Sequence, residues 1–193
     1  MEDIQYLIDK YNPSIIINSG CAGSLIEKVK VLGRMELVSS SDKYKLIIDY
    51  AHNGVSTESI LTTIWEYKPK RIVTIFGCGG NRSRDRRYEM GEIAGKYSDF
   101  CIITEDNNRY EDFFDIARDI LDGISDIMCE GLIIPDRKNA IRYAINNSIA
   151  GDVIMLIGKG HEAYKEIKGV RYPFDERKVI SEILNENKNS SSN

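Results

Sequence analysis

A glycine- and arginine-rich segment, residues 77–87, is the strongest candidate for a ligand site in this sequence. Three of its first four residues are glycines, and arginines follow at positions 82, 84, 86 and 87. Glycine lets the backbone approach a ligand closely, and the free N–H groups of a helix N-terminus attract anions. Arginine adds bidentate recognition of carboxylate or phosphate groups. The segment is therefore expected to bind an anion between a strand and a helix.

Other polar residues follow the remaining apolar runs of the chain. They are Asp49, Tyr50 and His52, then residues 105–109, then Asp136 and Arg137, and finally residues 158–162. In open α/β sheets, ligands bind at the carboxyl ends of the strands. Both histidines fall in these segments, whereas the middles of the apolar runs carry no charge. This asymmetry predicts a polar binding site at one edge of a sheet.

Each candidate also has a structural explanation. Asp49 could cap a turn, His52 could be a structural histidine, and residues 158–160 could form a plain turn. The aspartates at 112, 136 and 175 precede helix-like segments and suit an N-cap role. The arginines at 84, 86 and 87 are expected on the helix surface or in domain-closure contacts, which leaves Arg82 as the expected ligand contact.

Two common nucleotide-binding motifs are incomplete in this sequence. The dinucleotide fingerprint GxGxxG would need a glycine at Arg82. A phosphate-binding P-loop ending at Lys159 would need a glycine at Val153 and a serine or threonine at Gly160. Neither motif therefore supplies a complete nucleoside-triphosphate site.

Short apolar runs alternate with helix-period segments from residue 44 onward. Strands are predicted at 45–49, 72–76, 100–104, 132–134 and 153–157, helices at 56–67, 86–97 and after each of the three aspartate caps, and a hairpin at 166–172. Continuous apolar strands that alternate with helices favour a mostly parallel sheet covered on both faces. The predicted fold class is a Rossmann-like three-layer α/β/α domain with a small C-terminal β-hairpin.

Three ranges describe the expected domain organisation. Residues 1–30 are expected to be an N-terminal remnant or linker of unclear structure, with helix-like segments at 4–11 and 24–30. The α/β domain is expected to span residues 31–186. Residues 187–193 are polar and are expected to form a disordered tail.

The composition argues against several other classes of protein. A net charge of −4 over 193 residues speaks against a nucleic-acid-binding surface. No apolar run approaches the ~20 residues of a membrane span, and no signal peptide is visible, so a cytoplasmic protein without membrane contact is expected. The four cysteines form no CxxC pair and are expected to be reduced thiols. Two separate histidines give no zinc signature, and no bound metal is expected.

Several short motifs occur in an order and spacing that resemble the C-terminal domain of the Mur ligases, in particular of the members that add diaminopimelate. They are GRME at 33–36, DYAH at 49–52, GCGGNR at 77–82, DNNR at 106–109 and GKGHE at 158–162, with DRKNAI at 136–141 and PFDER at 173–177. The resemblance covers about residues 25–185, and several motifs in register make it specific.

The resemblance implies a three-domain enzyme, of which this sequence matches only the third domain. In such ligases the first domain holds a UDP-sugar, the central domain holds ATP and magnesium, and the third brings the incoming amino acid. The implied reaction phosphorylates UDP-N-acetylmuramoyl-L-Ala-D-Glu from ATP, and the amine of meso-diaminopimelate attacks the resulting acyl phosphate. Because the phosphate loop of the central domain is missing, the chain alone is expected to be inactive.

The resemblance also implies roles for individual residues. Three residues match positions that face ATP: Arg34, Asp49 and His52, with Arg34 and His52 as the catalytic residues. Six residues match positions that bind diaminopimelate: Arg82, Asp106, Asn107, Arg109, Gly158 and Glu162. Carboxylates suit the amines of this substrate and guanidinium groups suit its acids. Arg109 would select against lysine, which lacks the second carboxylate.

One departure from the family pattern keeps other interpretations open. Asn108 stands where the family usually has proline, and proline fixes φ. The alternative is a standalone, non-catalytic module that binds an amino acid or a nucleotide. A different ligase of the superfamily, such as a cyanophycin or folylpolyglutamate synthetase, is disfavoured by the combination of GCGGNR and DNNR.

Overall fold

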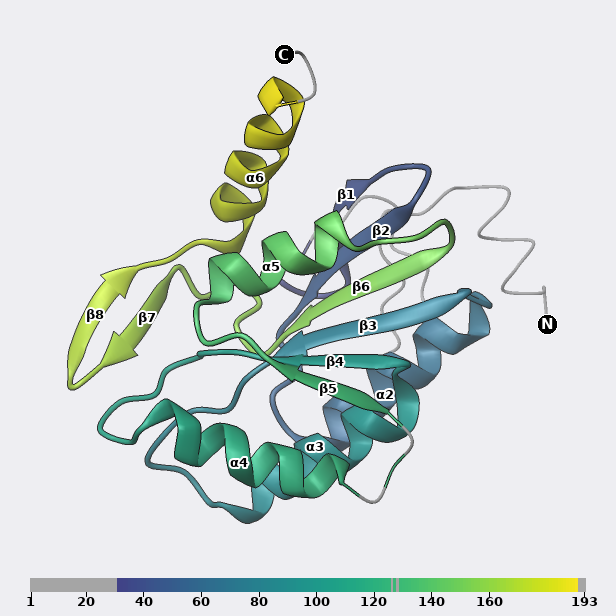
Figure 1. The fold of residues 1–193 in the computed structure, drawn as a ribbon. Helices are drawn as coiled ribbons and strands as arrows, with labels where there is room; N and C mark the ends of the chain where they lie inside the picture. Colours follow the sequence, from purple (N-terminus) through teal and green to yellow (C-terminus); the bar gives the residue numbers. More distant parts are fainter. Residues whose placement is uncertain (1–30, 126, 128, 191–193) are drawn as a thin grey trace.

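A six-stranded sheet lies at the centre of the computed structural model, which describes residues 31–190 apart from 126 and 128 (Figure 1). The strand order is β1-β2-β6-β3-β4-β5, and every neighbouring pair is parallel except β1 and β2. The strands are β1 (Glu36–Ser40), β2 (Tyr44–Asp49), β3 (Arg71–Phe76), β4 (Phe100–Ile103), β5 (Glu130–Ile133) and β6 (Asp152–Ile157). The predicted mostly parallel sheet is confirmed.

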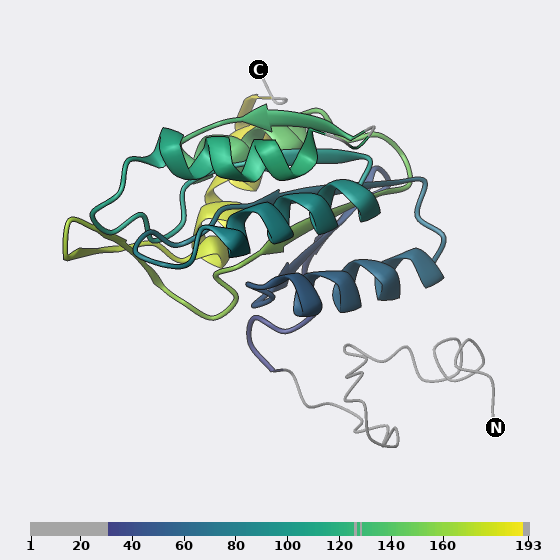
Figure 2. The same ribbon diagram turned by 90° about the horizontal axis from the view of Figure 1, so that it is seen from below.

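Helices cover both faces of this sheet (Figures 1 and 2). One face carries α2 (Gly54–Glu66), α3 (Asp85–Tyr97) and α4 (Phe113–Ile124), and the other carries α5 (Arg137–Asn146) and α6 (Glu176–Ser190). Successive side chains of a strand point to opposite faces. In β2, Ile47 accordingly packs in the core beneath α2–α4, whereas Leu46 and Ile48 pack in the core beneath α5 and α6. The three-layer α/β/α fold is thus confirmed, and it explains why the central strands β3, β4 and β6 are mostly apolar and buried.

Local signals in the sequence place the ends of several elements correctly. Asp112, Asp136 and Asp175 each accept a hydrogen bond from a backbone N–H in the first turn of the next helix, at 2.8 to 3.0 Å. A separate hairpin of β7 (Tyr164–Ile167) and β8 (Val170–Pro173) turns at Lys168 and Gly169, which have φ of 50° and 76°. The N-caps and the hairpin are therefore confirmed.

The edge strand β1 was not predicted from the sequence. It pairs antiparallel with β2, and a bulge between Leu37 and Ser39 interrupts its register. Five partly exposed residues with a bulge give a weak alternation of apolar and polar side chains. Only the pairing with β2 therefore defines this strand.

The last helix is longer than predicted. It continues to Ser190, so the prediction of a disordered tail is wrong for residues 187–190. Contacts with α5 hold this end, because Glu186 pairs with Arg142 at 2.7 Å and Asn187 donates to Asn146 at 2.9 Å. The predictions for residues 1–30 lie outside the described residues. Within the described part, no helix has the length and apolar character needed to cross a membrane.

Candidate functional site

The loops after β2, β3, β4 and β6 enclose a cavity of about 170 Å³ at the carboxyl edge of the sheet. Its lining residues are Tyr50, His52, Gly77, Cys78, Gly79, Arg82, Arg86, Asp106, Asn107, Arg109, Gly158 and Glu162. All six residues predicted to bind the amino acid are among them, together with His52. The carboxyl ends of parallel strands meet at one edge, and this brings the predicted residues together.

Two of the lining loops are locked to each other. The N–H of Gly80 donates to the carbonyl of Asn107 at 2.9 Å, and Nη1 of Arg109 donates to the carbonyl of Gly80 at 2.6 Å. A Cβ at Gly80 would overlap the carbonyl oxygen of Asn108, and a Cβ at Gly77 would overlap that of Thr104. These two glycines therefore serve close packing between loops, and Gly77 also lines the cavity.

The arginines of the segment 77–87 have different environments. Arg87 is 1% exposed, and its guanidinium group bonds Asp119 at 2.9 Å and Glu111 at 2.7 Å. Arg84 bonds the same Asp119 from the surface. The prediction of a helix-surface or domain-closure role is thus wrong for Arg87, because burial of its charge is matched by two carboxylates.

Three arginines form what we call the basic wall of the cavity: Arg82, Arg86 and Arg109. Arg82 and Arg86 form no hydrogen bond or ion pair with any residue that the structure describes. Arg86 was predicted on the helix surface or in domain-closure contacts, and in the structure it lines the cavity, as Arg82 does. Two guanidinium groups without protein partners are available to bind an anion.

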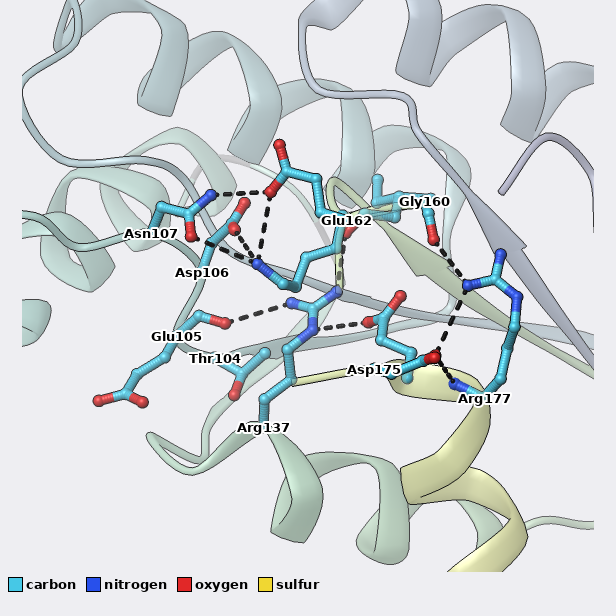
Figure 3. A network of polar contacts seen from close by, with 12 residues as sticks. Thr104, Glu105, Asp106, Asn107, Arg137, Gly160, Glu162, Asp175 and Arg177 are labelled. Atoms are coloured by element: carbon cyan, nitrogen blue, oxygen red, sulfur yellow. Dashed lines mark hydrogen bonds and ion pairs between the residues drawn. The ribbon is translucent and has the colours of Figure 1, made fainter. Parts of the chain in front are cut away.

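A second group of residues, which we call the acidic wall, comprises Asp106, Asn107 and Glu162 of the lining together with Lys159, which contacts all three. Nζ of Lys159 lies 3.1 Å from Asp106 Oδ1 and 3.6 Å from Glu162 Oε2, and Asn107 Nδ2 donates to Glu162 Oε2 at 2.9 Å. Figure 3 shows Asp106, Asn107 and Glu162 directed toward one another. Gly158 has φ of 108°, and a Cβ there would lie 3.3 Å from Asp106 Oδ2. The acidic wall is thus ordered by its own contacts.

Sequence reasoning missed Lys159, whose side chain is 1% exposed. The signal that could have found it is its position directly after the fully buried strand β6, between two glycines of positive φ. Such a lysine has little room to reach solvent and needs a buried counter-charge.

The hairpin β7–β8 supports the loop that carries Arg109. Arg109 has φ of 52°, its N–H donates to the carbonyl of Glu166 at 3.0 Å, and its carbonyl accepts from Lys168 at 2.6 Å. The N–H of Glu166 donates to Asn107 Oδ1 at 2.9 Å. Asn108 is buried, and its side-chain oxygen has no hydrogen-bond partner among the described residues. The loop is thus fixed by the hairpin even though Asn108 replaces proline.

Of the three residues predicted to face ATP, His52 lines the cavity, whereas Asp49 and Arg34 do not. Asp49 is buried and accepts from the N–H groups of Met35 at 2.8 Å and Ala51 at 2.7 Å, and burial raises its pKa. This arrangement matches the turn-capping explanation. Arg34 lies outside the cavity lining, with its guanidinium 5.1 Å from the centre of the Tyr50 ring. His52 lines the cavity, and its Nδ1 lies 2.8 Å from the carbonyl oxygen of Tyr50.

The buried side chain of Arg137 contacts strand ends that border the cavity (Figure 3). Arg137 bonds Glu176 at 2.7 Å and donates to the carbonyls of Glu105 and Ile157 at 3.3 and 3.0 Å. These carbonyls follow β4 and end β6, so Arg137 ties the two strand ends together. It does not line the cavity. The motifs DRKNAI and PFDER therefore hold the site in shape.

Neither a reactive thiol nor a metal cluster is found at the cavity. Burial raises the pKa of the Cys78 thiol to about 12, so it stays protonated at neutral pH. In the described part of the chain, no group of three or more His, Cys, Asp or Glu side chains is placed to hold a metal ion.

The three-layer α/β/α fold is the one that the motif resemblance implies, and the comparison with known proteins identifies the family. The chain belongs to the Mur ligase family, because residues 33–160 match the family described as "Mur ligase, glutamate ligase domain". Its relatives include the UDP-N-acetylmuramoyl-L-alanyl-D-glutamate–2,6-diaminopimelate ligases of Aquifex aeolicus (47% identical, covering 81% of this chain and 32% of the relative) and Caldanaerobacter subterraneus (44% identical, 83% and 33%).

Solved structures agree with this assignment. A ligase of the same name has a TM-score of 0.76 at 32% identity, covering 83% of this chain and 33% of that one. The UDP-N-acetylmuramate-alanine ligase of Thermotoga maritima, at 16% identity and a TM-score of 0.58, covers 83% and 31% and shares the fold. The chain spans about a third of the length of the curated relatives that it matches.

Proposed function

We propose that this chain is the amino-acid-binding part of an ATP-dependent ligase that adds meso-diaminopimelate to UDP-N-acetylmuramoyl-L-Ala-D-Glu. The observation that carries the proposal is that guanidinium groups of the basic wall and carboxylates of the acidic wall line the same cavity. Diaminopimelate has two carboxylates and two amines. Arg82 and Arg86 suit the carboxylates, and Asp106 and Glu162 suit the amines. Relatives that are 44–47% identical carry the name of this activity.

In the proposed reaction, the chain orients the attacking amine. ATP supplies the phosphoryl group that converts the peptide carboxylate into an acyl phosphate. The amine then forms the amide bond, phosphate leaves, and one proton is released. ATP and magnesium would be held mainly by parts of the enzyme outside the described residues, with Arg34, Asp49 and His52 facing ATP. We place this reaction in the cytoplasm, where ATP is available.

Arg109 is the residue that we propose to distinguish diaminopimelate from lysine. One of its N–H groups bonds the carbonyl of Gly80 at 2.6 Å, and its Nε lies 3.9 Å from Glu166. Arg109 lines the cavity, and these two contacts fix its guanidinium group there. The remaining donors can grip the second carboxylate, which lysine lacks.

Isothermal titration calorimetry of the chain with meso-diaminopimelate and with L-lysine tests the proposal. We expect binding of diaminopimelate and at least about tenfold weaker binding of lysine, since one charge-assisted contact contributes about 1.5 to 3 kcal/mol. Arg109→Ala should remove this preference. The control is Arg118→Ala, on the exposed face of α4, where Arg118 pairs with Asp115. Equal affinity of the unmodified chain for the two amino acids would refute the proposal.

A non-catalytic binding module is the second candidate, because the walls of the cavity are held in place by contacts within this chain. Turnover distinguishes the two. The chain alone, with ATP, magnesium and both substrates, should form no tripeptide. Addition of the part of the Aquifex aeolicus relative that this chain does not match should restore ligation if the chain is a ligase domain. Binding without restored ligation would favour the module.

A further inference from the structure

The acidic wall contains a buried cation of its own. Nζ of Lys159 lies 3.1 Å from Asp106, 3.4 Å from Asn107 and 3.6 Å from Glu162. Asp106 and Asn107 each accept a hydrogen bond from this ammonium group, and Glu162 forms an ion pair with it. All three residues belong to the set predicted to bind the amino acid. The ring of Tyr164 closes the environment, with its centre 5.7 Å from Nζ.

The charges of this wall do not cancel. Asp106 and Glu162 contribute two negative charges and Lys159 contributes one positive charge, which leaves one negative charge. Two neighbouring carboxylates without a cation repel each other, and a buried ammonium group without counter-charges is costly. Asp106 Oδ2 accepts no hydrogen bond from the described residues and lies beside Gly158, where the absence of a Cβ leaves space. The excess charge is thus directed at the cavity.

Other charged or titratable groups around the wall do not remove this excess. Tyr50 faces Glu162, and burial followed by the charge of Glu162 raises the pKa of Tyr50, so it stays neutral. His52 lines the cavity from the side of β2. The arginines face the cavity from the basic wall. Lys159 is therefore the cation that sits within the acidic wall itself.

We propose that Lys159 is a positioning and specificity residue that sets the acidic wall to a single negative charge, so that this wall takes up one ammonium group of the ligand. The inference rests on the proposed function and adds a residue to it. A merely structural lysine would, when replaced, weaken all ligands alike. If Lys159 sets the charge, a different result is expected. Its replacement by a neutral residue leaves the wall with two negative charges and increases the affinity of the wall for the ammonium group of a ligand.

Calorimetry with two ligands separates these outcomes. Meso-diaminopimelate and 2-aminopimelate share both carboxylates, but 2-aminopimelate lacks one amine. The dissociation constant of 2-aminopimelate divided by that of meso-diaminopimelate, both at pH 8, measures how strongly the acidic wall favours a second ammonium group. We expect the unmodified chain to prefer diaminopimelate by at least about tenfold. Lys159→Gln should raise this ratio by about tenfold or more, and Glu162→Gln, which leaves no net charge, should lower it toward one.

Further variants guard against misfolding. Lys159→Met is a second neutral replacement, and Lys159→Arg keeps the charge and should keep the ratio. Thermal unfolding identifies the variants that fold. A Lys159→Gln ratio that is unchanged, or that falls as for Glu162→Gln, would overturn the inference while leaving the proposed function standing. Failure of the unmodified chain to bind either ligand would overturn both.

Discussion

Replacement of Arg87 by methionine tests how the glycine- and arginine-rich segment is held in place. The side chain of Arg87 is 2% exposed and bonds two carboxylates, Asp119 at 2.9 Å and Glu111 at 2.7 Å. Removal of one partner from a buried ion pair costs about 3 to 5 kcal/mol, because a charge is left uncompensated. Asp119 keeps its bond to Arg84, so we expect a loss of about 3 kcal/mol in the free energy of unfolding.

Arg84→Met is the matched control for this prediction. Arg84 bonds the same carboxylate, but 68% of its side chain is exposed, and exposed pairs contribute little. Urea unfolding followed by circular dichroism measures both variants. For a chain of this size, a loss of 3 kcal/mol also lowers Tm by about 6 to 12 °C. If Arg87→Met costs no more than Arg84→Met, Arg87 behaves as a surface residue and the reasoning is refuted.

Three further outcomes test other parts of the structure. Gly80→Ala should lower the free energy of unfolding by about 1 to 3 kcal/mol, because its Cβ would overlap the Asn108 carbonyl oxygen. Gly95→Ala is the control, because Gly95 lies inside α3 and faces only side chains, and this variant should not be destabilised. Equal urea midpoints for the two variants would contradict the close packing of the loops. Hydrogen bonds from Arg84 and then Arg87 hold the pKa of Asp119 below its usual 3.8. The resulting stability is present above that usual value and is lost as pH falls through the lowered one. The urea concentration at the unfolding midpoint should therefore fall when the pH is lowered below about 4. An equally steep fall in the Asp119→Asn variant would show that other carboxylates cause it. The sulfur atoms of Cys101 and Cys129 lie 3.6 Å apart, so diamide, a two-electron oxidant, should link them with loss of two hydrogen atoms. Mass spectrometry should find the linked peptide in the unmodified chain and not in Cys129→Ser; its absence in both would show that the strands hold the thiols apart.

The parts of the fold that the sequence predicts well are those with local signals. The strands β2, β3 and β6 are apolar runs bounded by turns, and Asp112 and Asp136 mark helix starts through bonds to residues two or three positions away. The site residues at the strand ends follow from the same reasoning, because parallel strands end at one edge. Strand β1 lacks such a signal and depends on its partner.

The environment of single charged residues could not be predicted from neighbouring sequence. Lys159 meets Asp106 across 53 residues, and Arg87 meets Asp119 across 32. In the linear sequence, Arg87 has the same kind of neighbours as Arg84 and Arg86, and all three are expected to be solvent-exposed in the first turn of a helix. The fold decides that one is buried, one lies at the surface and one lines the cavity.

The hydrogen bonds between loops 77–82 and 106–111 bear on any redesign of the candidate site. Gly80 and Arg109 exchange a contact across 29 positions of the chain, and Asn81 accepts from the N–H of Tyr110 at 3.2 Å. Groups that share hydrogen bonds respond non-additively to substitution. A loop transplanted alone from another member of the family would meet the wrong counterpart. The two loops therefore act as one structural unit, and a change of specificity at this site is expected to require that both are exchanged together.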